Sequence, residues 1–137
     1  MKNSIKQIPY TETWDIRHRV MWLDQPFDYV KLPEDEKGIH FGLFKNEKLI
    51  AVVSLFINHN EAQFRKLATE IHEQGQGYGT QLLSYLIDYV SQQKIKRVWC
   101  NARANKTLYY NKFGMVATNK KYIKGGIEFV VMEKIMD

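Results

Sequence analysis

The chain has 137 residues, 45% of them hydrophobic and 26% charged, and a formal net charge of +5. This size suits one domain, which we expect to span residues 1–137, and it excludes the need for disulfides or a structural metal. No apolar run reaches about 18 residues, so no membrane span is expected. The residues after Met1 lack the apolar stretch of a signal peptide, and Cys100 is the single cysteine. These features favour a cytoplasmic protein.

The positive charge favours anionic ligands, but the basic residues are scattered along the chain. We therefore read them as a solvated surface and expect no nucleic-acid partner. The four histidines show no metal-ligand spacing with Cys100, so no metal is expected.

The first 40 residues predict a strand, a helix and a loop. Ser4–Ile8 is expected to be a strand closed by Pro9, and Thr11 to cap a helix that runs to about Trp22. Asp24–Gly38 carries two prolines and an acidic run, which indicates a loop. That loop is either a cover over a substrate cleft or a solvated connection.

Three strands with tight turns are expected next. Ile39–Phe44 alternates in character, Leu49–Ile57 is almost continuously apolar, and Glu61–Thr69 follows a turn at residues 58–60. A continuous apolar run is typical of a strand buried on both faces. The turn between the first two strands is placed at residues 45–48. The pattern predicts an antiparallel meander.

The second half of the chain predicts a crossover and a closing hairpin. An apolar helix is expected over Gln81–Gln93, leading to a strand at Arg97–Ala102 whose partner in the sheet is parallel. A short helix follows over about Lys106–Lys112 and ends at Gly114. Two last strands are placed at Met115–Thr118 and Glu128–Ile135. The fold class is therefore α+β.

The stretch Gln74–Thr80 links the meander to the crossover helix and carries the first chemical signal. Glycine at positions 75, 77 and 79 removes the Cβ atoms from one side of a loop, so a ligand can lie on the backbone. No acidic residue lies between Gln74 and Asp88 to neutralise the positive end of the helix. We interpret this loop as a pyrophosphate site.

Two common phosphate motifs do not fit this loop. A dinucleotide-binding loop would need glycine or alanine where Thr80 stands, and a carboxylate about 20 residues later, where Val98–Asn101 has none. A P-loop would need Gly-Lys-Ser/Thr, which is absent.

What does fit is Gln/Arg-x-x-Gly-x-Gly/Ala, matched by Gln74, Gly77 and Gly79. This loop resembles the coenzyme A pyrophosphate loop of the GNAT superfamily of N-acetyltransferases. A second stretch, Asn101–Met115, resembles the signature of the same family in which a short helix carries a tyrosine that faces the thioester sulfur. In that register Tyr110 is the general acid, and its neighbour at position 109 packs as an aromatic.

The resemblance extends from about Ile39 to the C-terminus, and its details are similar to the small acyltransferases related to ElaA of enteric bacteria. Three positions depart from the family pattern. Lys106 stands where alanine is usual, Met115 where phenylalanine is usual, and Thr69 where valine is common. The first two change the wall of the pocket, whereas Thr69 still offers its backbone.

The resemblance implies the GNAT fold: a mixed central sheet with an antiparallel meander, a parallel splayed strand pair and flanking helices. It also implies that an acetyl group moves from acetyl-CoA to a primary amine by direct attack in a ternary complex. The acceptor would be a small molecule or a protein amine, and edge strands allow a homodimer. The alternative is a coenzyme A-binding module without turnover.

The resemblance assigns roles to particular residues. Tyr110 would protonate the leaving thiolate, since a thiol pKa near 8.5 and a tyrosine pKa near 10 are close. Glu70 or His72 is the expected base or water relay, with Glu73 and His40 as further candidates. The expected cofactor-binding residues are Leu67, Ala68, Thr69, Gln74, Gly75, Gln76, Gly77, Tyr78, Gly79, Thr80, Asn105, Tyr110 and Lys112.

Overall fold

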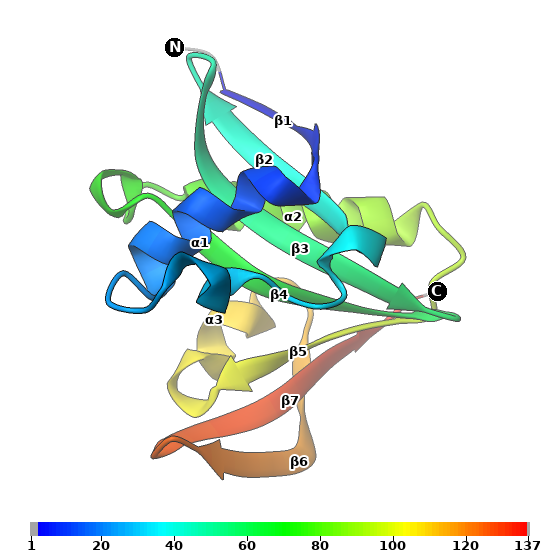
Figure 1. The fold of residues 1–137 in the computed structure, drawn as a ribbon. Coiled ribbons are helices and arrows are strands. Elements are labelled where there is room, and N and C mark those ends of the chain that lie inside the picture. The colour runs from blue at the N-terminus through cyan, green and yellow to red at the C-terminus, as the bar shows by residue number, and fades with distance from the viewer. Residues whose placement is uncertain (1–2, 137) are drawn as a thin grey trace.

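The computed structural model describes residues 3–136. Its strands are β1 (Asn3–Ile8), β2 (Ile39–Lys45), β3 (Lys48–Asn58), β4 (Glu61–Thr69), β5 (Arg97–Arg103), β6 (Val116–Lys124) and β7 (Ile127–Ile135). They form one sheet in the order β1-β2-β3-β4-β5-β7-β6 (Figure 1). Every neighbouring pair is antiparallel except β4 and β5, which run parallel. The predicted meander, crossover and closing hairpin are confirmed.

In the described part of the chain, three α-helices flank the sheet: α1 (Trp14–Met21), α2 (Tyr78–Ser91) and α3 (Thr107–Asn111). Figure 1 shows α1 on one face and α2 on the other. Within residues 3–136, no helix combines the length and the apolar character that crossing a membrane requires. Short 3-10 turns lie at Tyr10–Thr13, Phe27–Val30, Asp35–Lys37, Ile71–Glu73 and Ala104–Lys106.

Strand β3 lies at the centre of the molecule because both of its faces are covered. Alternate residues Ala51, Val53 and Leu55 join the large core beneath α2, whereas Val52 packs with Ile16 of α1 on the other face. Side chains alternate between the two faces of a strand, so a strand between two helical layers is expected to be apolar on both faces. The prediction of a doubly buried strand is confirmed.

Both long helices begin at residues other than those the sequence indicated. Thr11 does not cap α1: the chain enters through a 3-10 turn, α1 begins at Trp14, and the Thr13 hydroxyl donates to the Tyr10 carbonyl at 2.7 Å. Helix α2 spans Tyr78–Ser91 rather than Gln81–Gln93. A helix start is set by backbone conformation at its cap, which the apolar spacing of later residues does not report.

A buried polar network holds the segment between α1 and β2. Arg17 and Asp35 form an ion pair with N–O distances of 2.8 and 3.0 Å, and Arg17 also donates to the Ser54 hydroxyl of β3 at 2.8 Å. Ser54 contacts His40 Nδ1 at 2.7 Å, and His40 Nε2 contacts the Asp35 carbonyl at 2.8 Å. Buried groups therefore anchor the segment to the sheet, although most of its residues are exposed, as in a solvated connection, and none of residues 24–38 lines the cavity described below.

The parallel strands β4 and β5 are hydrogen-bonded over only a short stretch and then diverge. Strands β4 and β5 pair only from Glu61↔Arg97 to Gln63↔Trp99, although β4 continues to Thr69 and β5 to Arg103. Beyond this point β5 stays paired with β7 on its other side. The residues of β4 after Gln63 therefore present an unpaired edge toward β5, and the predicted splay is confirmed (Figure 1).

Candidate functional site

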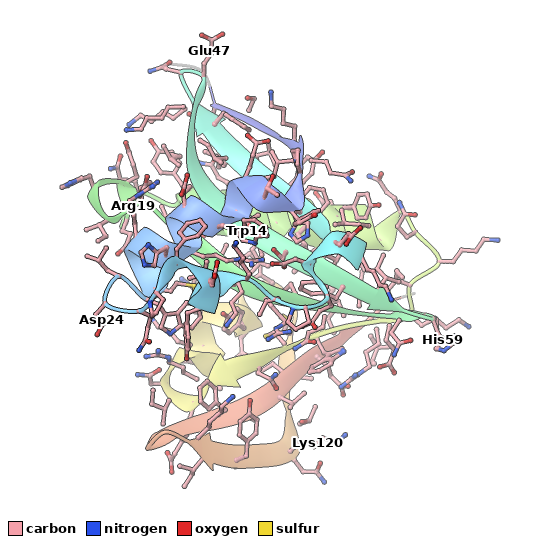
Figure 2. All side chains as sticks on the ribbon, in the orientation of Figure 1. Trp14, Arg19, Asp24, Glu47, His59 and Lys120 are labelled. Atoms are coloured by element: carbon pink, nitrogen blue, oxygen red, sulfur yellow. The ribbon has the colours of Figure 1, made fainter. Side chains whose placement is uncertain are left out.

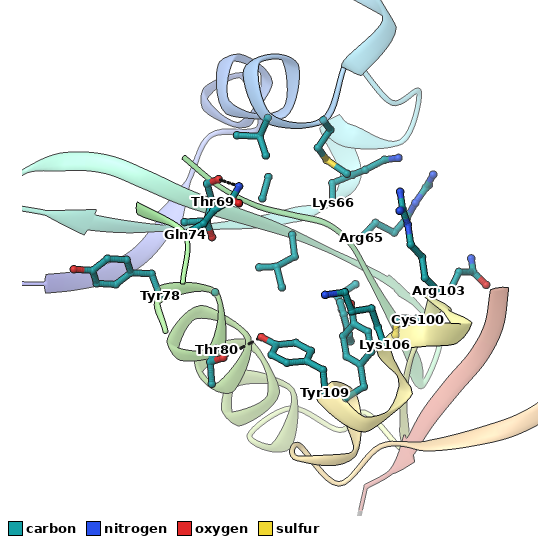
Figure 3. A pocket seen from close by; sticks show the side chains of 18 of the residues that line it. Arg65, Lys66, Thr69, Gln74, Tyr78, Thr80, Cys100, Arg103, Lys106 and Tyr109 are labelled. Atoms are coloured by element: carbon teal, nitrogen blue, oxygen red, sulfur yellow. Dashed lines mark hydrogen bonds between the residues drawn. The ribbon is translucent and has the colours of Figure 1, made fainter. Parts of the chain in front are cut away.

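A cavity of about 830 Å³ occupies the splay between β4 and β5. Figure 3 shows it bordered by the N-terminus of α2 on one side and by the end of β5 and α3 on the other. The edge of β4 forms its long wall, from Gln63 to Thr69. The cavity therefore joins the glycine loop, the open strand edge and the tyrosine-bearing helix, which lie far apart in the sequence.

The glycine loop ends in a bare helix N-terminus. Gly77 precedes α2 with φ of 86°, a left-handed conformation that glycine adopts without steric cost, and a Cβ there would meet nothing within 4 Å. The first turn of α2 has no side-chain cap and no acidic residue. Its free N–H groups and the positive end of the helix dipole together make an anion site.

Two residues of the loop contribute differently from what the motif suggests. The Gln74 side chain donates to the Thr69 carbonyl at 2.9 Å, which ties the loop to the end of β4. Tyr78 is buried in the core, and in Figure 3 its ring points away from the cavity. Only the backbone of Tyr78 remains for a ligand.

Strand β4 carries a bulge in the middle of the cavity wall. Its register against β3 shifts between Val52 and Ser54, and Lys66 at this point has φ of 61°. A left-handed conformation at a lysine costs about 1–2 kcal/mol, so the surrounding structure must impose it. The bulge re-aims Lys66 and the following residues, as bulges beside active sites commonly do.

The two neighbouring tyrosines have distinct environments. The Tyr109 hydroxyl lies 3.0 Å from Thr80 Oγ1 and so joins α3 to α2 (Figure 3). Tyr110 is half-buried, and its ring lies 5.9 Å from that of Phe64. Burial raises the pKa of Tyr110 well above the ordinary tyrosine value, with smaller contributions from Cys100 and Tyr109. Tyr110 is thus held protonated.

Cys100 also lines the cavity, but its thiol is not activated. The side chain is buried, and burial raises its pKa to about 12. A nucleophilic cysteine needs a lowered pKa, so Cys100 acts as part of the apolar wall.

The carboxylates and histidines expected to act as a base lie in other surroundings. Glu70 binds Arg19 with an N–O distance of 2.6 Å and does not line the cavity, and exposed His72 does not line it either. Glu73 lines the cavity at the end nearest the glycine loop but binds Lys45 at 3.0 Å. His40 is buried in the polar network, where burial lowers its pKa. None of these placements supports a particular base.

The structure brings most of the expected cofactor-binding residues together. Gln76, Asn105 and Lys112 do not line the cavity. Several lining residues were not expected from the sequence, among them Trp22, Lys66, Arg103 and Lys124, because no local pattern distinguishes them from surface residues. Within residues 3–136, no group of three or more His, Cys, Asp or Glu side chains is placed to hold a metal ion. The expected residues that do line it are Leu67, Ala68, Thr69, Gln74, Gly75, Gly77, Tyr78, Gly79, Thr80 and Tyr110.

Comparison with protein families shows to which family this chain belongs. Residues 29–136 match the model of the acetyltransferase (GNAT) domain. The chain belongs to the GNAT family of acetyltransferases. A relative, the uncharacterized N-acetyltransferase YitI of Bacillus subtilis, is 28% identical over 142 residues, which cover 96% of this chain and 95% of YitI.

Solved GNAT structures share the fold. ElaA of Escherichia coli superposes with a TM-score of 0.81 at 17% identity, covering 97% of this chain and 99% of ElaA. The PaiA N-acetyltransferase of Thermoplasma acidophilum, crystallised in complex with coenzyme A, superposes with a TM-score of 0.75 at 15% identity, covering 98% and 99% of the two chains. The predicted GNAT membership and fold, including the likeness to ElaA, are confirmed.

Proposed function

We propose that this protein transfers an acetyl group from acetyl-CoA to a primary amine by direct attack in a ternary complex. The observation that carries the proposal is the single cavity shared by the bare N-terminus of α2, the open edge of β4 and the Tyr110 hydroxyl. Family membership supports acyl transfer from an acyl-CoA. The complex of PaiA with coenzyme A supports the choice of ligand.

Each part of the cosubstrate has a matching surface. The diphosphate would bind the free N–H groups at residues 75–80, where the helix dipole favours an anion. The pantetheine arm would pair with the unpaired backbone of β4 at residues 67–69, as an added strand. Backbone N–H groups on this edge would also stabilise the oxyanion of the tetrahedral intermediate, an effect worth about 3–4 kcal/mol in other enzymes.

Tyr110 would give its proton to the thiolate that leaves. Burial raises the pKa of Tyr110, so the difference between this pKa and that of a free thiol in water is wider than the ordinary values of the two groups give. The thiolate forms in the same desolvated cavity, however, and burial raises a thiol pKa as it does for neighbouring Cys100. The two shifts have the same sign, so the transfer stays feasible.

The amine would enter as the free base. Glu70 lies outside the cavity in an ion pair and exposed His72 lies outside it too, so their assignment as base remains a prediction. An amine that loses its proton to water before attack makes kcat/KM rise with pH in parallel with the fraction of neutral amine. A plateau well below the amine pKa would instead indicate an enzymic base.

Adjacent tyrosines provide a matched test of the mechanism. Tyr110→Phe should lower kcat for thiol release by about 100-fold or more while the Kd of coenzyme A changes little. Tyr109→Phe removes one hydroxyl from the same helix and loses only the contact with Thr80, so a few-fold change is expected.

Two results would contradict the proposal. Full activity of Tyr110→Phe would remove the tyrosine from the mechanism. Tight binding of coenzyme A with no thiol release for any amine would favour a binding module without turnover.

A further inference from the structure

The cavity has a second end, opposite the glycine loop. Figure 3 shows Arg65, Lys66 and Arg103 gathered there, whereas Gln74 and Thr80 lie at the other end. The elements that meet at this end are the C-terminus of α1, the bulge of β4, the end of β5 and the β6–β7 hairpin. Their side chains in the cavity include Trp22, Lys66, Arg103, Tyr122, Lys124 and Phe129.

The charges at this end are not balanced within the described chain. Arg65 binds Glu34 with an N–O distance of 2.6 Å, but Lys66, Arg103 and Lys124 make no ion pair with any residue of 3–136. Among the described residues, Glu73 is the one acidic residue in the cavity lining, and it lies beside the glycine loop. The second end is therefore cationic, and Glu34 is paired with Arg65 rather than with Lys66, Arg103 or Lys124.

Lys66 is held in place at this end. The β4 bulge sets its backbone at φ of 61°, and its Nζ lies 4.2 Å from the centre of the Trp22 ring. Burial, and to a smaller extent the charges of Arg65, Arg17 and Lys124, together lower the pKa of Lys66 to about 8 against the opposing effect of Asp35. A half-buried cation surrounded by cations is stabilised by a bound anion.

The phosphates of the cosubstrate do not account for these cations. The proposed diphosphate site lies at residues 75–80, beyond the end of β4 at Thr69. Residues along a strand are spaced by about 3.3 Å, so Lys66 stands roughly 10 Å before that end. The other substrate is therefore a source of an anion for Lys66 that the diphosphate site does not supply.

We infer that the amine acceptor is a small molecule with an anionic group, a carboxylate or a phosphate, which binds to Lys66, Arg103 and Lys124. Its amine then points along the cavity toward Tyr110. The stacked rings of Tyr122 and Phe129, 5.2 Å apart and at 15°, offer a flat apolar wall for the carbon body of the acceptor. This inference rests on the proposed transferase function.

Matched amines test the inference. Thiol release is measured with 4-(aminomethyl)benzoate and its neutral amide, and with phosphoethanolamine and ethanolamine, each at equal concentration of free amine. In at least one pair, the anionic member should have a kcat/KM higher by about 10-fold or more, because hydrogen bonds to charged groups discriminate to that extent. The first pair reports on a carboxylate and the second on a phosphate. Added salt should reduce the preference.

Variants of two lysines that line the cavity are compared with a control variant on β6. Lys66→Gln and Lys124→Gln should each remove most of the preference. Lys120→Gln should retain it, because Lys120 lies on the same strand as Lys124 but does not line the cavity and stands at the outer edge of the molecule in Figure 2. Equal Tm values for the three variants establish that the fold is intact.

The two proposals fail in different ways. Neutral amines that react as well as anionic ones, or a preference that survives Lys66→Gln, would overturn the inference and leave the transferase function standing. If no amine reacts, the transferase proposal fails. In that case calorimetric titration of 4-(aminomethyl)benzoate and of phosphoethanolamine with coenzyme A present gives the second readout, and no binding of either overturns the anion site as well.

Discussion

Replacing Asp35 by alanine should destabilise the protein strongly. The Asp35 carboxylate is buried and accepts two hydrogen bonds from Arg17, one from Trp14 Nε1 at 3.0 Å and one from the Leu32 N–H at 2.9 Å. These contacts join α1 to the segment that leads to β2. No other ion pair among residues 3–136 is buried on both sides.

The magnitude follows from what the substitution leaves behind. Arg17 is fully buried, its Nε already has no partner, and without Asp35 its charge would face only the Val30 carbonyl and the Ser54 hydroxyl. Breaking a buried pair by removing one partner costs about 3–5 kcal/mol. With an unfolding entropy of about 2.1 cal/mol/K per residue, this corresponds to a fall in Tm of roughly 10–17 °C.

Urea unfolding and thermal scans measure the loss against two comparisons. Asp28→Ala removes an exposed ion pair with Lys31 in the same region, and its cost should stay below about 1 kcal/mol. Arg17→Met combined with Asp35→Leu removes both charges, so it should be more stable than Asp35→Ala by about 2 kcal/mol or more. A loss below about 1 kcal/mol in Asp35→Ala, or a double variant as unstable as the single one, would refute the reasoning.

Three further outcomes follow from the same structure. Burial alone would raise the pKa of Asp35, but the hydrogen bonds from Arg17, Leu32 and Trp14 outweigh it and lower the pKa; the urea midpoint should therefore fall as pH drops below about 4, and less so in the variant without the pair. Because the Cys100 pKa is about 12, iodoacetamide at pH 8 should label it only after unfolding; rapid labelling of the native protein would show that the thiol is accessible. Gly77→Ala should lower the free energy of unfolding by about 1–2 kcal/mol, because residue 77 has a φ of 86° that alanine adopts only with strain. Gly79→Ala meets only Thr69 Oγ1 at 3.5 Å and should stay folded while the Kd for coenzyme A rises, so an unchanged Kd would contradict a close backbone approach.

Local patterns in the sequence determined the elements and the first half of the site. Each of these patterns involves only a few neighbouring residues. They are the continuous apolar run of β3, the glycines of residues 75–79, and Tyr110 followed by Gly114. Periodicity reports which side chains share a face, and glycine reports where the backbone needs positive φ or a close approach. These signals were sufficient for the α+β class and for the interpretation of the glycine loop as a phosphate site.

The tertiary structure alone decided the rest. Arg17 and Asp35 are 18 residues apart, and as letters in a sequence they do not differ from solvated surface charges. Lys66 and Lys124 meet in one cavity only because β4 bulges and the β6–β7 hairpin lies beyond β5. Burial, pairing and charge repulsion depend on which distant segments share a volume, and that is settled by packing of the whole sheet rather than by neighbouring residues.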